Sequence, residues 1–169
     1  MPTRRSARRV ALQLLYQNDV AQCDVLETLE QVRYWPFQQI NKLGDDPSMD
    51  DSPDFLSSLH LEELDTQNLD YVLEVVRGTI EHRQEIDDML REVSQNWRLE
   101  RMAVAERNIL RMALYEILHR PEVPPRVAIN EAIDLAKIYG DEKSGGFVNG
   151  VLDAAYLRFR STSKSEENL

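Results

Sequence analysis

The residues best suited to chemistry in this sequence are four arginines near its N-terminus, Arg4, Arg5, Arg8 and Arg9. Residues 1–12 contain these four cations and no acidic residue, and no other part of the chain has so dense a basic cluster free of acids. A guanidinium group donates hydrogen bonds to phosphate oxygens and stacks on the face of a base. The chemistry that this cluster offers is therefore nucleic-acid binding.

The arginines lie where a helix is expected to begin. Val10 and Leu14, like Ala11 and Leu15, are spaced four residues apart, which predicts an apolar stripe on a helix over residues 6–20. Cations at the start of a helix oppose its dipole. Two interpretations stay open: the arginines serve an anionic ligand, or they are solvated at a cost of a few tenths of a kcal/mol.

The net charge of −10 argues against general binding of nucleic acid, because an acidic surface repels phosphates. The charge is unevenly distributed, however, so any surface that binds nucleic acid must be local. Residues 43–76 hold no Lys or Arg, and their acidic residues are Asp45, Asp46, Asp50, Asp51, Asp54, Glu62, Glu63, Asp65, Asp70 and Glu74.

Catalytic and metal-binding patterns are not found in the sequence. His60, His82 and His119 lack metal-ligand spacing, so we expect no zinc site and no cofactor. Cys23 is the only cysteine, which excludes an intramolecular disulfide and favours a reducing, cytoplasmic compartment. No stretch approaches the roughly 20 apolar residues of a membrane span, and no secretory signal is expected.

The Gly-rich stretch at residues 140–146 resembles a phosphate-binding loop only superficially. Lys143 and Ser144 lack the preceding glycine spacing of a Walker loop, and a helix rather than a strand precedes them. We predict a turn between two helices, with Asp141 or Ser144 as the N-cap. Neighbouring carboxylates such as Asp87 and Asp88 are expected on solvated helix faces.

Helical periodicity dominates the chain, and strand alternation is almost absent. The pattern predicts an all-α, compact helical domain of packed bundles over residues 1–160, followed by a polar C-terminal tail over 161–169. Gly78 inside the third helix indicates a close contact between helices. The expected helices cover residues 6–20, 24–34, 65–93, 103–119, 128–139 and 144–159.

Residues 43–64 are predicted to form an acidic loop insertion. Gly44, Pro47 and Pro53 interrupt any periodicity, and the clustered acids favour a solvated, mobile segment over a functional one. If this segment packs against the protein, we expect a short extra helix. Its anchors are then Phe55, Leu56 and Leu59.

Four blocks of sequence, in order along the chain, resemble the NusB family of transcription antitermination factors. The last two are continuous, VPPRVAINEAIDLAKIYG from Val123 and DEKSGGFVNGVLD from Asp141, and they are the most specific. The other two are RRSARRVALQLLY from Arg4 and ERNILRMALYE from Glu106. The resemblance covers most of the chain.

The resemblance implies an all-helical fold of two small packed bundles and a role in binding RNA rather than catalysis. The expected RNA is the single-stranded boxA element, bound together with the ribosomal protein NusE. The complex is expected to join the RNA polymerase elongation complex with other Nus factors and to promote read-through in ribosomal RNA operons.

The same resemblance assigns residues to the RNA surface. Arg4, Arg5 and Arg8 match basic positions of the family's RNA-binding arm, whereas Arg9 is assigned to RNA on charge alone. Phe147 matches an aromatic residue of the family's RNA surface. A place in the core of the last helix is an equal alternative for Phe147.

Other positions concern the protein partner or depart from the family pattern. Tyr16, Glu100 and Glu106 match positions that face NusE. Ser6 and Gly146 stand where some relatives have Arg and Lys, which removes two phosphate partners. The connection between the second and third helices is longer than is usual in the family.

Two other functions compete with antitermination. A ribosome-assembly or scaffolding factor with the same fold is not separated from it by sequence. An accessory domain of an RNA methyltransferase is a more distant alternative, because such enzymes need a further domain with a Gly-rich cofactor loop. No such loop occurs in this chain, so we expect it not to be an enzyme.

Overall fold

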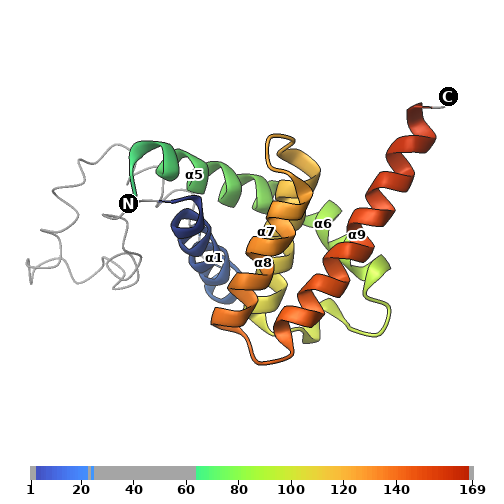
Figure 1. The fold of residues 1–169 in the computed structure, drawn as a ribbon. Coiled ribbons are helices and arrows are strands. Elements are labelled where there is room, and N and C mark those ends of the chain that lie inside the picture. The colour runs from blue at the N-terminus through green and yellow to red at the C-terminus, as the bar shows by residue number, and fades with distance from the viewer. Residues whose placement is uncertain (1–2, 23, 25–63, 168–169) are drawn as a thin grey trace, which may run out of the picture. The chain divides into compact units, whose positions relative to one another are not determined.

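The computed structural model describes residues 3–22, 24 and 64–167. All regular elements in these ranges are helices, so the all-α prediction is confirmed (Figure 1). The chain divides into two compact units, residues 1–77 and 78–169, which are described separately below. No helix of the described ranges is long and apolar enough to span a membrane.

In the first unit, helix α1 spans Arg4–Ala21. The side chain of Thr3 caps it by accepting a hydrogen bond from the backbone N–H of Ser6, at 3.1 Å. The predicted apolar stripe of α1, with Val10 and Leu14, is buried. Helix α5, Thr66–Glu81, begins in the same unit, and Asp65 accepts from the backbone N–H of Asn68 at 2.8 Å.

The second unit is built around one central helix. In α7 every residue from 108 to 117 is buried, as expected for a helix surrounded by others. It packs against α6, α8 and α9, and α8 packs against α9. The elements are α6 (Arg83–Val93), the short 3₁₀ helix η3 (Leu99–Arg101), α7 (Val104–His119), α8 (Pro125–Tyr139) and α9 (Ser144–Glu167).

The prediction of one helix over residues 65–93 is wrong, because the structure separates α5 from α6 at His82. There the carbonyl of Gly78 accepts from both the backbone N–H and the ring Nδ1 of His82, at 3.0 and 2.9 Å. The close contact at Gly78 is confirmed. A Cβ atom built on this glycine would lie 2.0 Å from the ring of Tyr115.

The predicted end of the last helix near Phe159 is also wrong, because α9 continues to Glu167. Hydroxyl groups of the polar segment donate to carbonyls one turn earlier, and these bonds give the side chains partners within the helix. The donors are Ser161, Thr162, Ser163 and Ser165. At its other boundary, α8 starts at Pro125, three residues before the predicted start, because proline is favoured at the first position of a helix.

The carboxylate of Asp87 was expected on a solvated face, and this expectation is wrong. Asp87 is 7% exposed and accepts two hydrogen bonds from the guanidinium of Arg111, at 2.7 and 2.9 Å. The two residues are 24 positions apart, so helical spacing did not reveal the pair. Three predictions lie outside the described residues, except for Asp24 and Leu64: the helix at 24–34, the mobile acidic loop at 43–64 and its anchors Phe55, Leu56 and Leu59.

Candidate nucleic-acid interface

The start of α1 presents arginines to solvent. Arg4, Arg5 and Arg9 are exposed, and the first turn of the helix contains no acidic residue. Arg8 differs from the other three because it is only 5% exposed. The exposed members of this group, which we call the α1 arginines (Arg4, Arg5 and Arg9), therefore form the accessible part of the predicted RNA-binding arm.

A buried tyrosine of α5 orders this end of α1. The guanidinium carbon of Arg4 lies 4.4 Å from the ring centroid of Tyr71, and that of Arg8 lies 5.5 Å from it. Arg4 also donates to the backbone carbonyl of Gln67, at 3.4 Å. Cation–π contacts of this kind hold a guanidinium in place without neutralising its charge. Arg4 therefore keeps its charge available to an anion.

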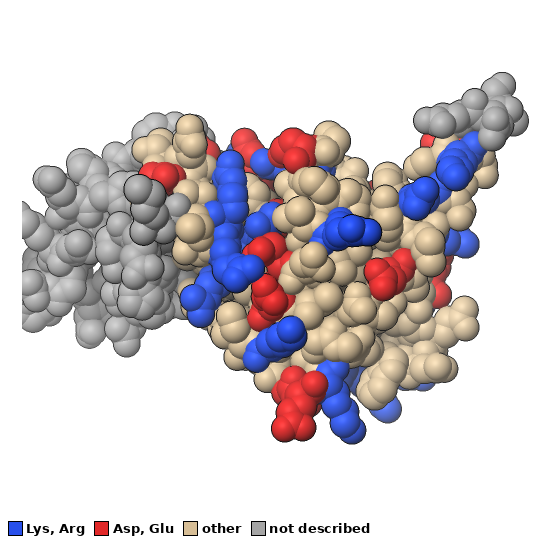
Figure 2. All heavy atoms as spheres, viewed as in Figure 1, with Lys and Arg blue, Asp and Glu red and all other residues tan. Residues whose placement is uncertain are grey.

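The acidic character of the chain is concentrated away from α1 in sequence. Residues 25–63, outside the described ranges, contain nine acidic and two basic residues, and so carry seven of the ten net negative charges. On the face shown in Figure 2, basic and acidic side chains of the described residues are interspersed. A net charge of −10 is thus compatible with local positive surface.

A second candidate contact lies in the other unit, at the start of α9. Phe147 is half-buried, and its ring meets that of Trp97 edge to face with centroids 5.7 Å apart. Trp97 is 61% exposed. The core residues of this helix are others, among them Val148 and Leu152. Phe147 therefore lies at the surface edge of the core with an accessible aromatic neighbour.

The two rings border an open groove of about 360 Å³. One wall is the segment from Val93 to Trp97, and the other is the α9 face that carries Gly146, Phe147 and Gly150. A Cβ atom at either glycine would meet nothing within 4 Å. Sequence reasoning missed Trp97, although a tryptophan in a short connection between helices is a recognisable signal of a surface contact.

The residues matched to the NusE-facing positions come from both units. Tyr16 of α1 is 43% exposed. Glu100 of η3 accepts a hydrogen bond from Arg91 at 3.3 Å, and its pKa is lowered by a hydrogen bond from its own backbone and then by Arg91. Glu106 of α7 accepts a hydrogen bond from the hydroxyl of Ser144 at 2.5 Å. Its carboxylate therefore already has a partner within the second unit.

The stretch at residues 140–146 is the predicted turn between two helices. Asp141 accepts from the backbone N–H groups of Lys143 and Ser144, at 2.8 and 3.1 Å. The hydroxyl of Ser144 in turn accepts from the N–H of Asp141 at 2.9 Å. These bonds cap α9, and the bond from Lys143 is the main reason why the pKa of Asp141 lies below its usual value.

The described part of the chain is thus all-helical, and its two candidate contacts expose arginine side chains in the first unit and aromatic side chains in the second. Comparison with known proteins gives the family. The model of the NusB family matches residues 5–157. The transcription antitermination protein NusB of Anaeromyxobacter sp. (strain Fw109-5) is 45% identical over 151 residues, which cover 89% of this chain and 87% of the relative.

Solved structures agree with this assignment. NusB of T. maritima has a TM-score of 0.70 and 30% identity, and the match covers 92% of each chain. A chain from the crystal structure of the antitermination factors NusB and NusE in complex with dsRNA has a TM-score of 0.64 and 26% identity. That match covers 92% of this chain and 96% of the other.

The chain therefore belongs to the NusB family of transcription antitermination proteins. Members of this family are not enzymes. The predictions of family, of an all-α fold and of a non-enzymatic role are confirmed.

Proposed function

We propose that this chain binds single-stranded boxA-type RNA in the cytoplasm together with the ribosomal protein NusE. In this proposal the complex joins RNA polymerase and other Nus factors and promotes read-through in ribosomal RNA operons. The observation that carries the proposal is the exposed α1 arginines, which stand on a helix start without acidic residues. Arginine side chains suit both the phosphates and the unpaired bases of single-stranded RNA.

Aromatic rings supply the second element of the proposed recognition. Phe147 and the exposed ring of Trp97 border the same groove, and stacking of a base on an aromatic ring contributes about 1–3 kcal/mol. Arg8 is assigned an indirect role, since it is buried beside Tyr71. Its contribution is to hold the start of α1 in place.

The charge of the chain supports the proposed protein partner. A chain with a net charge of −10 and three exposed arginines on α1 makes few phosphate contacts alone. A basic ribosomal protein would complement acidic positions such as Glu100 and add positive charge toward RNA. A solved complex of a NusB with NusE and dsRNA supports this pairing for the family relative that it contains.

The deciding experiment is a titration of labelled boxA RNA with the full chain, with and without NusE, over a range of salt concentrations. The variant Arg4→Ala/Arg5→Ala should weaken binding. It should also lower the salt slope by about 0.7 for each lost phosphate contact. Arg160→Ala is the matched control, because Arg160 is also exposed and lies 5.7 Å from a tyrosine ring, that of Tyr156. The control should bind as the parent does.

Two further experiments test the preference for single-stranded RNA and separate antitermination from ribosome assembly. A duplex of the same sequence should bind more weakly than the single strand, because paired bases cannot stack on Phe147. A transcription assay on a ribosomal RNA leader template should show read-through that the arginine variant reduces. Unchanged affinity of the arginine variant in the presence of NusE would place the RNA site elsewhere. Tight RNA binding without any read-through would favour the ribosome-assembly alternative.

A further inference from the structure

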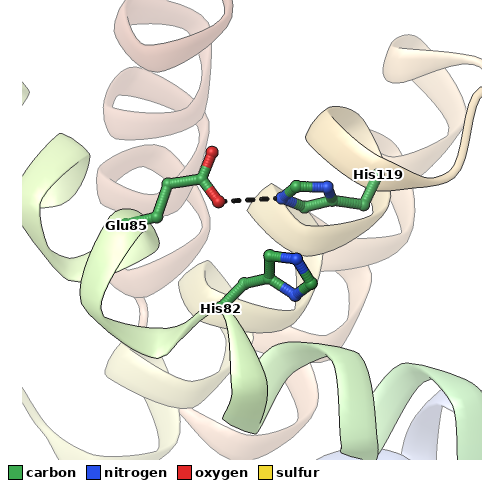
Figure 3. Close-up of side chains that lie close together, drawn as sticks. All are labelled: His82, Glu85 and His119. Atoms are coloured by element: carbon green, nitrogen blue, oxygen red, sulfur yellow. Dashed lines mark hydrogen bonds and ion pairs between the residues drawn. The ribbon is translucent and has the colours of Figure 1, made fainter.

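In the second unit His119 meets two residues that precede it by more than thirty positions, His82 and Glu85, and none of the three is among the residues proposed to bind RNA. His82 lies at the break between α5 and α6, Glu85 lies in the first turn of α6, and His119 is the last residue of α7. Each offers one ligand atom, and these atoms all lie within 4.8 Å of one another. Figure 3 shows the three side chains converging from the two helix ends.

The ring of His82 is oriented by the backbone carbonyl of Gly78. Its ring Nδ1 lies 2.9 Å from the carbonyl oxygen of Gly78. A carbonyl oxygen only accepts hydrogen bonds, so in the neutral imidazole Nδ1 carries the proton and Nε2 keeps its lone pair for another partner. Histidines that bind metal ions characteristically donate their other ring nitrogen to a carbonyl or carboxylate in this way.

Neighbouring rings restrict both histidines further. The centroids of His82 and His119 are 3.9 Å apart. The ring of Tyr115, which is 9% exposed, lies 5.8 Å from His82 and is stacked with His119 at 5.6 Å. Because Tyr115 also occupies the space left by Gly78, the two imidazoles are held against a packed support.

The open side of the cluster leaves room for an ion with its own water. The side chains of His119 and Glu85 are 28% and 52% exposed, and His82 is half-buried. In the structure His119 Nε2 is 2.9 Å from Glu85 Oε2. Two ligands of a tetrahedral zinc ion are about 3.4 Å apart when each lies about 2.1 Å from it. Small side-chain rotations would therefore bring the three groups to bonding distance of one ion.

We propose that His82, Glu85 and His119 form a binding site for a divalent transition-metal ion. Two imidazole nitrogens and one carboxylate, with water completing the coordination, suit Zn²⁺, Co²⁺ or Ni²⁺. Mg²⁺ and Ca²⁺ are disfavoured because they require oxygen ligands. The bound ion links the first turn of α6 to the end of α7, and so stabilises the second unit.

The test uses the full, tag-free chain carrying Cys23→Ser and His60→Gln, so that His82 and His119 are its only histidines and no thiol remains. Zn²⁺ is titrated by calorimetry, and Co²⁺ by visible absorption. We expect one ion per chain and a Co²⁺ spectrum of low coordination number. We also expect a higher melting temperature with Zn²⁺ and no comparable effect of Mg²⁺.

Substitutions at the three ligands should each weaken Zn²⁺ binding at least tenfold and abolish the shift in melting temperature. The variants are His82→Ala, His119→Ala and Glu85→Gln, and the last keeps the test valid if a histidine variant folds poorly. Glu92→Gln is the matched control, since Glu92 is an exposed carboxylate of α6 that pairs instead with Arg158 at 2.9 Å. Failure to bind one ion, or binding that survives both histidine substitutions, would overturn the proposal.

Discussion

Arginine has two different roles in this protein, and the contrast lies between the core of the second unit and the start of α1. Arg111 of α7 is 5% exposed and donates two hydrogen bonds to the buried carboxylate of Asp87. Arg4 is exposed, and it contacts the ring of Tyr71 and the backbone carbonyl of Gln67. The charge of Arg111 is balanced by the carboxylate of Asp87, whereas the charge of Arg4 is not balanced by the ring or the carbonyl that it contacts.

The difference shows what decides the use of an arginine. Arg111 and Arg4 are the same residue type on helices, and net charge does not distinguish them. Burial next to a carboxylate makes the one a structural group, because an unpaired buried charge would be strongly unfavourable. Arg4 stands at a helix start without acidic residues, and this makes it a candidate for binding RNA.

The largest expected effect is at the buried pair. Arg111→Met should destabilise the protein by roughly 3–5 kcal/mol, because the buried carboxylate of Asp87 loses both hydrogen bonds from Arg111 and keeps only the more distant Arg83, at 3.9 Å. Chemical denaturation measures the change. Adding Asp87→Leu should restore part of the lost stability, and Arg5→Met on α1 should change stability by less than about 0.5 kcal/mol. A stable Arg111→Met single variant would remove the basis of the comparison.

The next effect is at the aromatic pair of the second unit. Phe147→Ala and Trp97→Ala should each weaken RNA binding by about 1–3 kcal/mol if a base stacks there. Leu157→Ala is the control, because Leu157 is a 62% exposed apolar residue of α9 outside the groove. A loss of about 3–5 kcal/mol of stability in Phe147→Ala, with RNA affinity intact, would instead assign Phe147 to the core.

A smaller effect is expected at the tyrosine beside the α1 arginines. Tyr71→Leu removes the cation–π contact with Arg4, and should lower RNA affinity by about 0.5–1 kcal/mol. Tyr71→Phe keeps the ring and should bind RNA as the parent does. Calorimetric RNA titrations of both variants, together with their melting temperatures, test whether the ring positions the arginine. Equal loss in both variants would point to the hydroxyl group instead.

The smallest effect is expected at an exposed pair, Arg91 with Glu100. A hydrogen bond from its own backbone, and then Arg91, hold the pKa of Glu100 below its usual 4.5, so the ionised carboxylate stabilises the fold above the unfolded-state pKa of the group. This contribution is lost as the pH falls through the folded-state pKa. Melting temperature measured from pH 7 to pH 3 should therefore fall slightly more in the parent than in Glu100→Gln. High salt should reduce the difference, and a steeper fall in the variant would contradict it.

Most of the helices could be predicted from the sequence because their apolar residues repeat with helical spacing. The stripe of α1, with Val10 and Leu14, and the buried face of α7 follow from local pattern alone. The break at His82 could not be predicted in this way. At the break the ring of His82 packs against the rings of Tyr115 and His119, which are far from it in the sequence.

The candidate sites show the same limit. Arginines near the N-terminus are visible in the sequence, but the burial of Arg8 depends on its packing beside Tyr71. The pairing of Phe147 with Trp97 and the meeting of His82 with His119 likewise depend on how helices pack. Spacing along one helix reveals a face, whereas groups from two helices become neighbours only in the folded chain.

Gly146 and Gly150 stand one helical turn apart on α9, and both face open space beside the groove. Glycine within a helix is less favourable than alanine by about 1 kcal/mol, so a larger residue at either position gains helix stability without a clash. These two positions are therefore open to evolutionary change and to protein engineering. A single Gly146→Lys substitution would add a cation at the rim of the groove while the packing of α9 against α7 and α8 stays as it is.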